Sequence, residues 1–149
     1  MIEKDISFII PVFNRPIEVK ELLKSFIKLS SKKDFEIVII EDGSTKDSKD
    51  IVADFNRELN ISYYQKKNTG PGDSRNFGMK FAKGNYFIIL DSDCILPEDY
   101  IQNVTENLKN NYVDCFGGVD GSHESFSDYQ KAVSFSMTSF LTTGGIRGG

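Results

Sequence analysis

Short apolar runs that alternate with helix-like segments constrain the fold of this chain more than any other feature. Each run has the length and the β-branched or aromatic character of a strand. The runs cover residues 6–12, 35–40, 61–64, 86–90 and, more weakly, 112–116. Segments with apolar residues at helical spacing follow the first four runs, and the predicted helices begin near Pro16, Gly43, Asp73 and Pro97. This alternation predicts an α/β fold, a three-layer α/β/α sandwich around a mostly parallel, Rossmann-like sheet.

The regular pattern ends at Gly117-Gly118, which predicts a division of the chain. Residues 1–118 contain all the predicted strands and are expected to form one complete half of a domain. Residues 119–149 begin with a polar stretch, continue with the apolar spacing of an amphipathic helix and end in a glycine-rich run. Because a domain rarely closes on such a run, we expect this second part to be the incomplete start of another half.

The charge and the cysteines narrow the class of protein. The net charge is -4, whereas nucleic-acid-binding domains usually present a basic face, so no nucleic-acid partner is expected. The lysine pair Lys66-Lys67 lies beside a predicted turn and is expected to be solvated surface. Cys94 and Cys115 form no CxxC pair, which favours reduced thiols in the cytoplasm. No signal peptide or membrane-length apolar run is expected, although peripheral association with the inner face of the membrane and the oligomeric state stay open.

Polar motifs follow each of the first four predicted strands. They are Pro11–Arg15, Glu41–Ser44, Asn68–Asn76 and Asp91–Asp93. Because ligands of open parallel sheets bind outside the carboxyl ends of the strands, these motifs are expected to meet at one edge of the sheet.

Asp91 and Asp93 come directly after the apolar run 86–90, which is predicted to be a buried strand. Two carboxylates at the end of a buried strand are costly unless something positive meets them. A divalent cation takes one or two carboxylates and fills its other positions with phosphate oxygens and water. The pair therefore indicates a nucleotide held through a metal, and the alternative is a turn with an Asx cap that leads to Pro97.

Asp42 has two interpretations. An ionised carboxylate accepts hydrogen bonds and cannot donate them, so it suits the ring N3–H of uracil or thymine. The alternative is that Asp42 and Ser44 cap the N-terminus of the helix that follows. The neighbouring Glu41 is expected to be a second polar contact or a solvated charge.

The ordered set of motifs resembles the nucleotide-binding half of inverting glycosyltransferases of family 2, which have the GT-A fold. The resemblance covers residues 5 to about 118, and it implies that residues 1–118 bind the nucleotide sugar while 119–149 begin the acceptor side. It implies that Asp42 reads the base and that Asp93 of a DxD-type motif ligates Mg²⁺ or Mn²⁺, with Asp91 on the metal, its bound water or the ribose. Arg75 matches an arginine that approaches the diphosphate, and Gly70 lets the backbone come close. The alternative for Arg75 is a pair with a surface acid.

The first motif is expected to frame the nucleotide pocket. By resemblance, Asn14 and Arg15 contact the base or border the pocket, and Pro11 and Phe13 shape its wall. The alternative for these four residues is ordinary loop packing.

The resemblance implies a bacterial enzyme of polysaccharide biosynthesis, a hexosyltransferase or related transferase. It would move a sugar, with inversion, from a nucleotide-diphosphate donor, with UDP favoured, to a glycan or lipid-linked acceptor. The general base is expected beyond residue 149, with Asp120 as a weak candidate, so this chain is expected to bind donor and metal without efficient transfer. A nucleotide-binding or nucleotidyltransferase-like domain without sugar transfer is the alternative. The sequence speaks against it because neither a glycine-rich basic loop nor GxGxxG follows the first strand.

Overall fold

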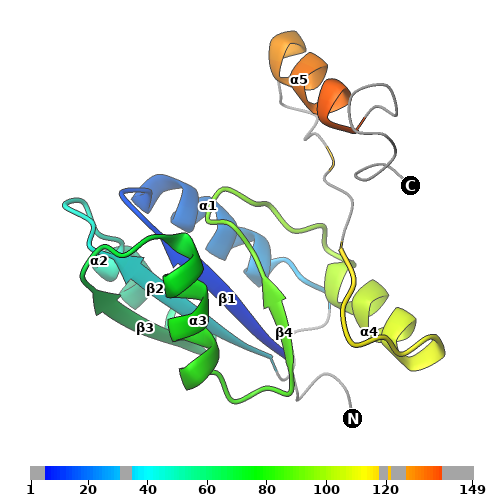
Figure 1. The fold of residues 1–149 in the computed structure, drawn as a ribbon, viewed down its shortest axis with the longest axis horizontal. Coiled ribbons are helices and arrows are strands. Elements are labelled where there is room, and N and C mark those ends of the chain that lie inside the picture. The colour runs from blue at the N-terminus through cyan, green and yellow to red at the C-terminus, as the bar shows by residue number, and fades with distance from the viewer. Residues whose placement is uncertain (1–5, 31–34, 118–120, 122–126, 139–149) are drawn as a thin grey trace. The chain divides into compact units, whose positions relative to one another are not determined.

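The computed structural model describes residues 6–30, 35–117, 121 and 127–138, which belong to two compact units, Met1–Tyr112 and Val113–Gly149. The described elements of the first unit are, in chain order, β1 (Ile6–Val12), α1 (Pro16–Ile27), β2 (Phe35–Asp42), α2 (Lys49–Phe55), β3 (Ile61–Lys66), α3 (Pro71–Phe81), β4 (Tyr86–Ile89) and α4 (Tyr100–Asn110) (Figure 1). In the second unit the described element is α5 (Asp128–Thr138). No helix in these ranges is long and apolar enough to cross a membrane.

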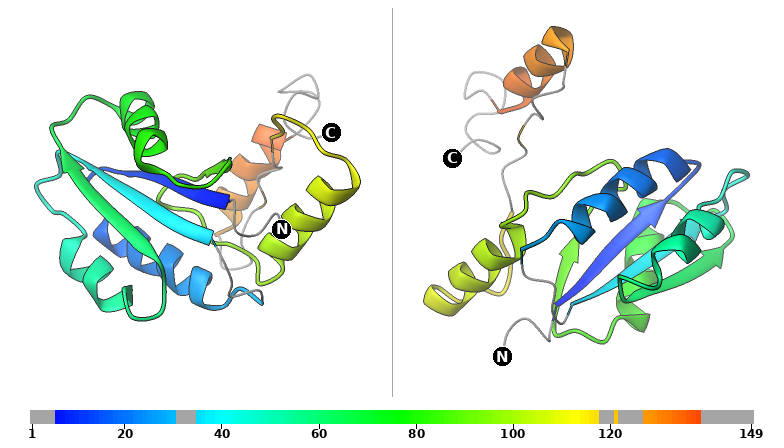
Figure 2. Two further views of the ribbon diagram at one scale, coloured as in Figure 1. Left: turned by 90° about the horizontal axis from the view of Figure 1, so that it is seen from below. Right: turned by 180° about the vertical axis from the view of Figure 1, so that it is seen from behind.

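The strands form one four-stranded sheet with the order β3-β2-β1-β4, and every neighbouring pair is parallel. Helix α3 lies on one face of the sheet, and α1 and α2 lie on the other, as the left view of Figure 2 shows. The predicted α/β/α sandwich with a parallel sheet is confirmed. Because all four strands run the same way, their carboxyl ends meet at one edge, where the predicted motifs lie.

Two apolar cores hold the layers together. The larger core joins the sheet to α1, α2 and α4, and within it Phe8 of β1 meets Phe26 of α1 edge to face at 4.8 Å between ring centroids. The smaller core joins the other face to α3, where Gly78 packs directly on the sheet. A Cβ at Gly78 would lie 2.5 Å from Ile40 Cδ1 and 2.8 Å from Ile9 Cγ2, so only glycine allows this approach. Each fully buried aliphatic or aromatic side chain contributes about 1.5–3 kcal/mol.

Pro11 lies inside the central strand β1, where a missing N–H normally breaks the ladder. The carbonyl of Ile9 accepts a hydrogen bond from Leu90 N at 3.1 Å, so the backbone groups of residues 9 and 11 face β4. The last pair between the two strands is Ile9 with Ile89, which means that β4 has ended before it reaches Pro11. The proline therefore costs no ladder hydrogen bond at this position.

Two sequence predictions about strands are wrong. The run before Asp91 is not a fully buried strand: Phe87 and Ile89 are 37% and 45% exposed, because among the described residues β4 is an edge strand and α3 covers β1 and β2. Residues 112–116 form no strand in the part of the chain that the structure describes. All of residues 111–117 are exposed, so no buried face selects extended backbone there. Residues 118–120 lie outside the described ranges, and the predicted boundary at 118 stays a prediction.

Candidate functional site

The loops at the carboxyl ends of the strands contact one another, as the sequence motifs predicted. The loop after β1 meets the β4 loop through Arg15 and Asp93, and helix α3 meets the same loop through Arg75 and Asp91. The loop after β1 also meets the β2 loop through Asn14, while Asp42 at the end of β2 holds the β3 loop. The residues predicted to bind a nucleotide thus lie along one edge of one sheet.

The acidic pair Asp91 and Asp93 lies on a turn after β4, and the two side chains are 66% and 57% exposed. Arg75 Nη2 donates to Asp91 Oδ1 at 2.8 Å, and Arg15 Nη1 lies 3.5 Å from Asp93 Oδ2. The expected reason for the pair, the cost of burying two carboxylates, is therefore wrong, because both are solvated and each faces an arginine. Among the described residues the two carboxylates bond to arginines and not to the turn's own N–H groups, unlike an Asx cap.

The donor set fits a hard divalent cation only if a ligand completes it. Asp91 and Asp93 offer carboxylate oxygens, and no third histidine, cysteine or acid joins them within the described ranges. Mg²⁺ commonly binds through one or two carboxylates together with phosphate oxygens and water. The exposed pair beside two arginines can therefore hold Mg²⁺ or Mn²⁺ in company with a diphosphate.

Arg75 is the hydrogen-bond donor best suited to bind such a diphosphate. Its side chain is one-third exposed, and its Nε is buried without a hydrogen-bond partner among the described residues. An unpaired buried donor costs about 1–3 kcal/mol, which a phosphate oxygen would recover. Arg75 does pair with an acid, as its alternative interpretation held, but that acid is Asp91 of the predicted metal site.

Asp42 is buried at 3% exposure and fastens the β3–α3 loop. Its Oδ1 accepts from Lys66 Nζ at 2.6 Å and from Thr69 N at 3.0 Å, and its Oδ2 accepts from Gly70 N at 2.9 Å. Gly70 has a φ of 95°, a conformation that favours glycine. The helix-cap interpretation of Asp42 is wrong, because α2 begins at Lys49 and its N-cap is Ser48.

The pKa of Asp42 lies below its usual value. Burial acts to raise it, but the ammonium of Lys66 and the N–H groups of Thr69 and Gly70 outweigh that effect. An ionised Asp42 can accept a hydrogen bond from a base and cannot donate one.

Lys66 is the residue that the sequence analysis missed. It is not solvated surface: its side chain is 11% exposed and its Nζ also lies 3.1 Å from Asp73 Oδ2. The same ammonium donates to Thr69 Oγ1 and to the carbonyl of Lys67. Burial acts to lower the pKa of Lys66, but Asp42 and Asp73 raise it overall. The strand register of the structure pairs Asp42 directly with Lys66, and the sequence alone does not give this register.

Glu41 is neither a solvated charge nor an open ligand contact. It is 1% exposed and accepts hydrogen bonds from Ser48 N at 3.0 Å, Ser48 Oγ at 2.6 Å and Tyr63 OH at 2.9 Å. It also accepts from Ser44 Oγ. Burial and the bond to Glu41 raise the pKa of Tyr63. Glu41 thus fixes the loop between β2 and α2 from inside the protein.

Asn14 fixes the same loop from the other side. Its Oδ1 accepts from the backbone N–H groups of Thr45 and Lys46, both at 2.9 Å, and its own N–H donates to Ser44 Oγ at 2.8 Å. Its φ of 55° lies in the left-handed region that asparagine tolerates. Phe13, next to it, is 50% exposed at the strand end, whereas Pro11 is buried in β1. Base contacts from these residues stay predictions, and Asp120 lies outside the described residues.

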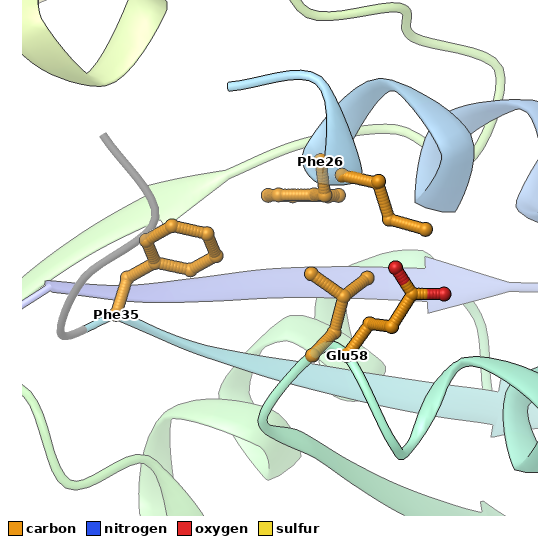
Figure 3. Close-up of a pocket in the computed structure, with 5 residues that line it drawn as sticks. Phe26, Phe35 and Glu58 are labelled. Atoms are coloured by element: carbon orange, nitrogen blue, oxygen red, sulfur yellow. The ribbon is translucent and has the colours of Figure 1, made fainter. Parts of the chain in front are cut away.

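One pocket lies at the other end of the strands. It is lined by Phe26, Ile27, Phe35, Glu58 and Leu59 (Figure 3). Its lining is aromatic and aliphatic apart from the carboxylate of Glu58, and no predicted site residue borders it. A phosphate ligand would find no cation among these residues, so the candidate site is the polar edge.

Comparisons with known proteins show the family of the chain. A family model described as glycosyl transferase family 2 matches residues 7–146. A protein of Rickettsia conorii named as an uncharacterized glycosyltransferase is 44% identical over 97 residues, which are 65% of this chain and 16% of that protein. The poly(ribitol-phosphate) beta-N-acetylglucosaminyltransferase TarS of Staphylococcus aureus is 35% identical over 102 residues, or 66% of this chain and 17% of TarS. The chain thus spans about a sixth of the length of these relatives.

Solved structures share the fold. The crystal structure of S. aureus TarS 1–349 in complex with UDP-GlcNAc has a TM-score of 0.69 at 29% identity, over 82% of this chain and 37% of that one. The mannosyltransferase PcManGT from Pyrobaculum calidifontis, in complex with GDP-Man and Mn²⁺, has a TM-score of 0.64 over 70% of this chain and 32% of that one. Its identity of 21% limits the second likeness to the fold.

Proposed function

Because this chain belongs to glycosyl transferase family 2, we propose that it is the donor-binding part of a glycosyltransferase that uses a UDP-linked sugar and a divalent cation. The predicted GT-A fold is shown by the likeness to solved glycosyltransferases. One observation carries the proposal: Arg75 pairs with Asp91 of the acidic turn, on the sheet edge that also holds Asp42, and its buried Nε has no hydrogen-bond partner among the described residues. A single edge of the sheet therefore carries the ligands for a cation, a hydrogen-bond donor for a diphosphate and a hydrogen-bond acceptor for a nucleotide base.

Different residues of the site bind the base, the diphosphate and the cation. Asp42 Oδ2, the less occupied oxygen of the carboxylate, accepts the N3–H of uracil, and the exposed ring of Phe13 offers an apolar wall. Arg75 donates to diphosphate oxygens from Nε and, once released from Asp91, from Nη2. Asp93 and Asp91 hold Mg²⁺ or Mn²⁺, which when bound offsets negative charge on the leaving nucleoside diphosphate.

Transfer with inversion places one further demand on the protein. An acceptor hydroxyl attacks the anomeric carbon from the face opposite the diphosphate, the bond to the diphosphate oxygen breaks, and a carboxylate takes the hydroxyl proton. We propose that this base lies outside the described residues, with Asp120 as a weak candidate.

The acceptor and the location belong to the same proposal. We propose a glycan or lipid-linked acceptor in bacterial polysaccharide biosynthesis. The likeness of the chain to TarS and to the Bacillus subtilis minor teichoic acid biosynthesis protein GgaB supports this proposal. We also propose a cytoplasmic location at the inner face of the membrane. Cys94 and Cys115 form no CxxC pair, which favours a reducing compartment.

The test is a calorimetric titration of UDP, with Mn²⁺ present, into the wild-type chain and into Asp93→Asn. The variant keeps the shape of the side chain and removes its charge, so UDP affinity is expected to fall at least tenfold. Asp54→Asn, on the exposed face of α2, is the matched control and should bind as the wild type does. Equal affinity of the wild type and Asp93→Asn would remove the metal role, and no UDP binding by the folded wild type would contradict the donor assignment.

A further inference from the structure

Lys66 links β2 to the first turn of α3 within the candidate site, although none of the sequence motifs includes it. Its largely buried ammonium meets Asp42 of β2 at 2.6 Å and Asp73 in the first turn of α3 at 3.1 Å. It also donates to Thr69 of the intervening loop. We propose that Lys66 is a positioning residue that sets base specificity, because it keeps Asp42 ionised and oriented as a hydrogen-bond acceptor. The inference rests on the proposed function, namely that a nucleotide occupies this edge of the sheet.

The geometry fixes which part of Asp42 remains for a ligand. Each carboxylate oxygen offers about two lone pairs. Oδ1 already accepts from Lys66 Nζ and Thr69 N, and Oδ2 accepts from Gly70 N. The hydroxyl of Ser74 also acts on this carboxylate and lowers its pKa. Oδ2 is therefore the less occupied oxygen, and Lys66 fixes its direction because it holds the other one.

The charge of Asp42 decides which bases fit. An ionised carboxylate accepts from a ring N–H, which uracil, thymine and guanine present, and it repels the ring nitrogen lone pair of cytosine or adenine. A protonated carboxyl would donate to that lone pair and lose the discrimination. Asp42 must therefore stay ionised for the site to prefer uracil over cytosine.

Lys66 is the cation that keeps this buried carboxylate charged. The charged groups that face Asp42 in the described structure are Lys66 from β3 and, beyond the ammonium, Asp73 from α3. Without Lys66, only the hydrogen bonds from Thr69, Gly70 and Ser74 would oppose the effect of burial, and the negative charge of Asp73 would add to that effect. Both effects favour the protonated form of Asp42, which binds cytosine as well as uracil.

The chain offers a matched control for the charge of Lys66. Lys67, the next residue, carries the same side chain but is exposed. Replacement of either lysine by methionine removes one positive charge at the carboxyl end of β3. A difference between the two variants therefore reports the contacts of Lys66 and not the net charge.

The experiment measures the affinities of UDP and CDP, with Mn²⁺ present, for the wild type and for Lys66→Met, Lys66→Arg and Lys67→Met. The wild type and Lys67→Met should prefer UDP at least tenfold. Lys66→Met should lose about tenfold in UDP affinity with a smaller change for CDP, so that the UDP-to-CDP ratio collapses. Lys66→Arg keeps the cation and should keep most of the ratio.

Several outcomes would overturn the inference. An unchanged ratio in Lys66→Met, or an equal loss for UDP and CDP, would leave Lys66 a purely structural role. If Lys66→Met does not fold, Lys66→Gln keeps a hydrogen bond to Asp42 without the charge, and a wild-type ratio in that variant would be equally decisive. Equal binding of UDP and CDP by the wild type would refute the inference alone, whereas binding of neither would refute the proposed function.

Discussion

The two ends of the candidate site are built in opposite ways. At the base end, Asp42 is 3% exposed, and its oxygens already accept from Lys66, Thr69 and Gly70. At the metal end, Asp91 and Asp93 have side chains that are 66% and 57% exposed, and each faces one arginine. The base end is thus part of the folded core, whereas the metal end is a solvated surface whose partners can exchange.

Because of this difference, we expect the base end to contribute to the stability of the fold and the metal end to contribute mainly to ligand binding. Exposed ion pairs contribute about 0–1 kcal/mol, so a cation and a diphosphate can replace the partners of the arginines at little cost to the fold. A buried carboxylate with N–H and ammonium donors cannot be removed without unpaired groups in the interior. The arginines therefore hold the metal end balanced in charge until the ligands arrive.

The largest expected effect compares one aspartate from each end. Asp42→Ala should lower the free energy of unfolding by about 2–4 kcal/mol, because buried Lys66 and two backbone N–H groups lose their acceptor. Asp93→Ala should change it by less than about 0.5 kcal/mol. Urea unfolding followed by circular dichroism measures both. Equal losses would show that the two ends do not differ as described.

The pH dependence of stability offers a second test of the buried base end. The folded pKa of Asp42 is depressed, so its stabilising contribution is present above its unfolded pKa, near 3.8, and is lost as the pH falls through the lower folded value. The stability gap between the wild type and Asp42→Asn should therefore be large at about pH 7 and shrink on acidification below about pH 4. Urea unfolding at a series of pH values measures this gap. A gap that stays constant across the series would contradict the account.

The smallest expected effect concerns the exchange of partners at the metal end. Arg75→Gln frees Asp91 from its 2.8 Å pair and removes a nearby positive charge, so Mn²⁺ alone should bind about two- to fivefold more tightly. The electron paramagnetic resonance signal of free Mn²⁺ measures this affinity. Arg57→Gln, at an exposed position just after α2, is the control. Unchanged or weaker Mn²⁺ binding by Arg75→Gln would mean that the arginine does not compete with the cation.

The sequence predicted the strands, the parallel sheet and the common edge of the motifs, because periodicity and strand-end position depend on local residues. It did not predict that β4 is an edge strand. The apolar run Tyr86–Ile89 reads the same whether one or both of its faces are covered, and its neighbours in the sheet are not local. The prediction of a strand at 112–116 failed because these residues are exposed, so that burial does not select extended backbone there.

The sequence also could not show which side chains pair with residues far along the chain. The sequence analysis expected Lys66 to be solvated and Glu41 to be a second polar contact or a solvated charge. In the structure both side chains are largely buried, and each has several polar partners. Their partners are far along the chain: Asp42 lies 24 residues from Lys66, and Tyr63 lies 22 residues from Glu41. Asp91 and Arg75 were expected on the same edge, but only the structure shows that they contact each other.

The most direct test titrates uridine and UDP into the wild-type chain, each with Mn²⁺ and again with EDTA. The account predicts that uridine binds weakly and equally in both conditions, because the base end needs no metal. UDP should bind at least tenfold more tightly with Mn²⁺ than with EDTA, because only the diphosphate joins the acidic pair to Arg75. Equal UDP affinity in the two conditions, or uridine binding that needs Mn²⁺, would contradict the division of the site into a preassembled base end and a metal-dependent diphosphate end.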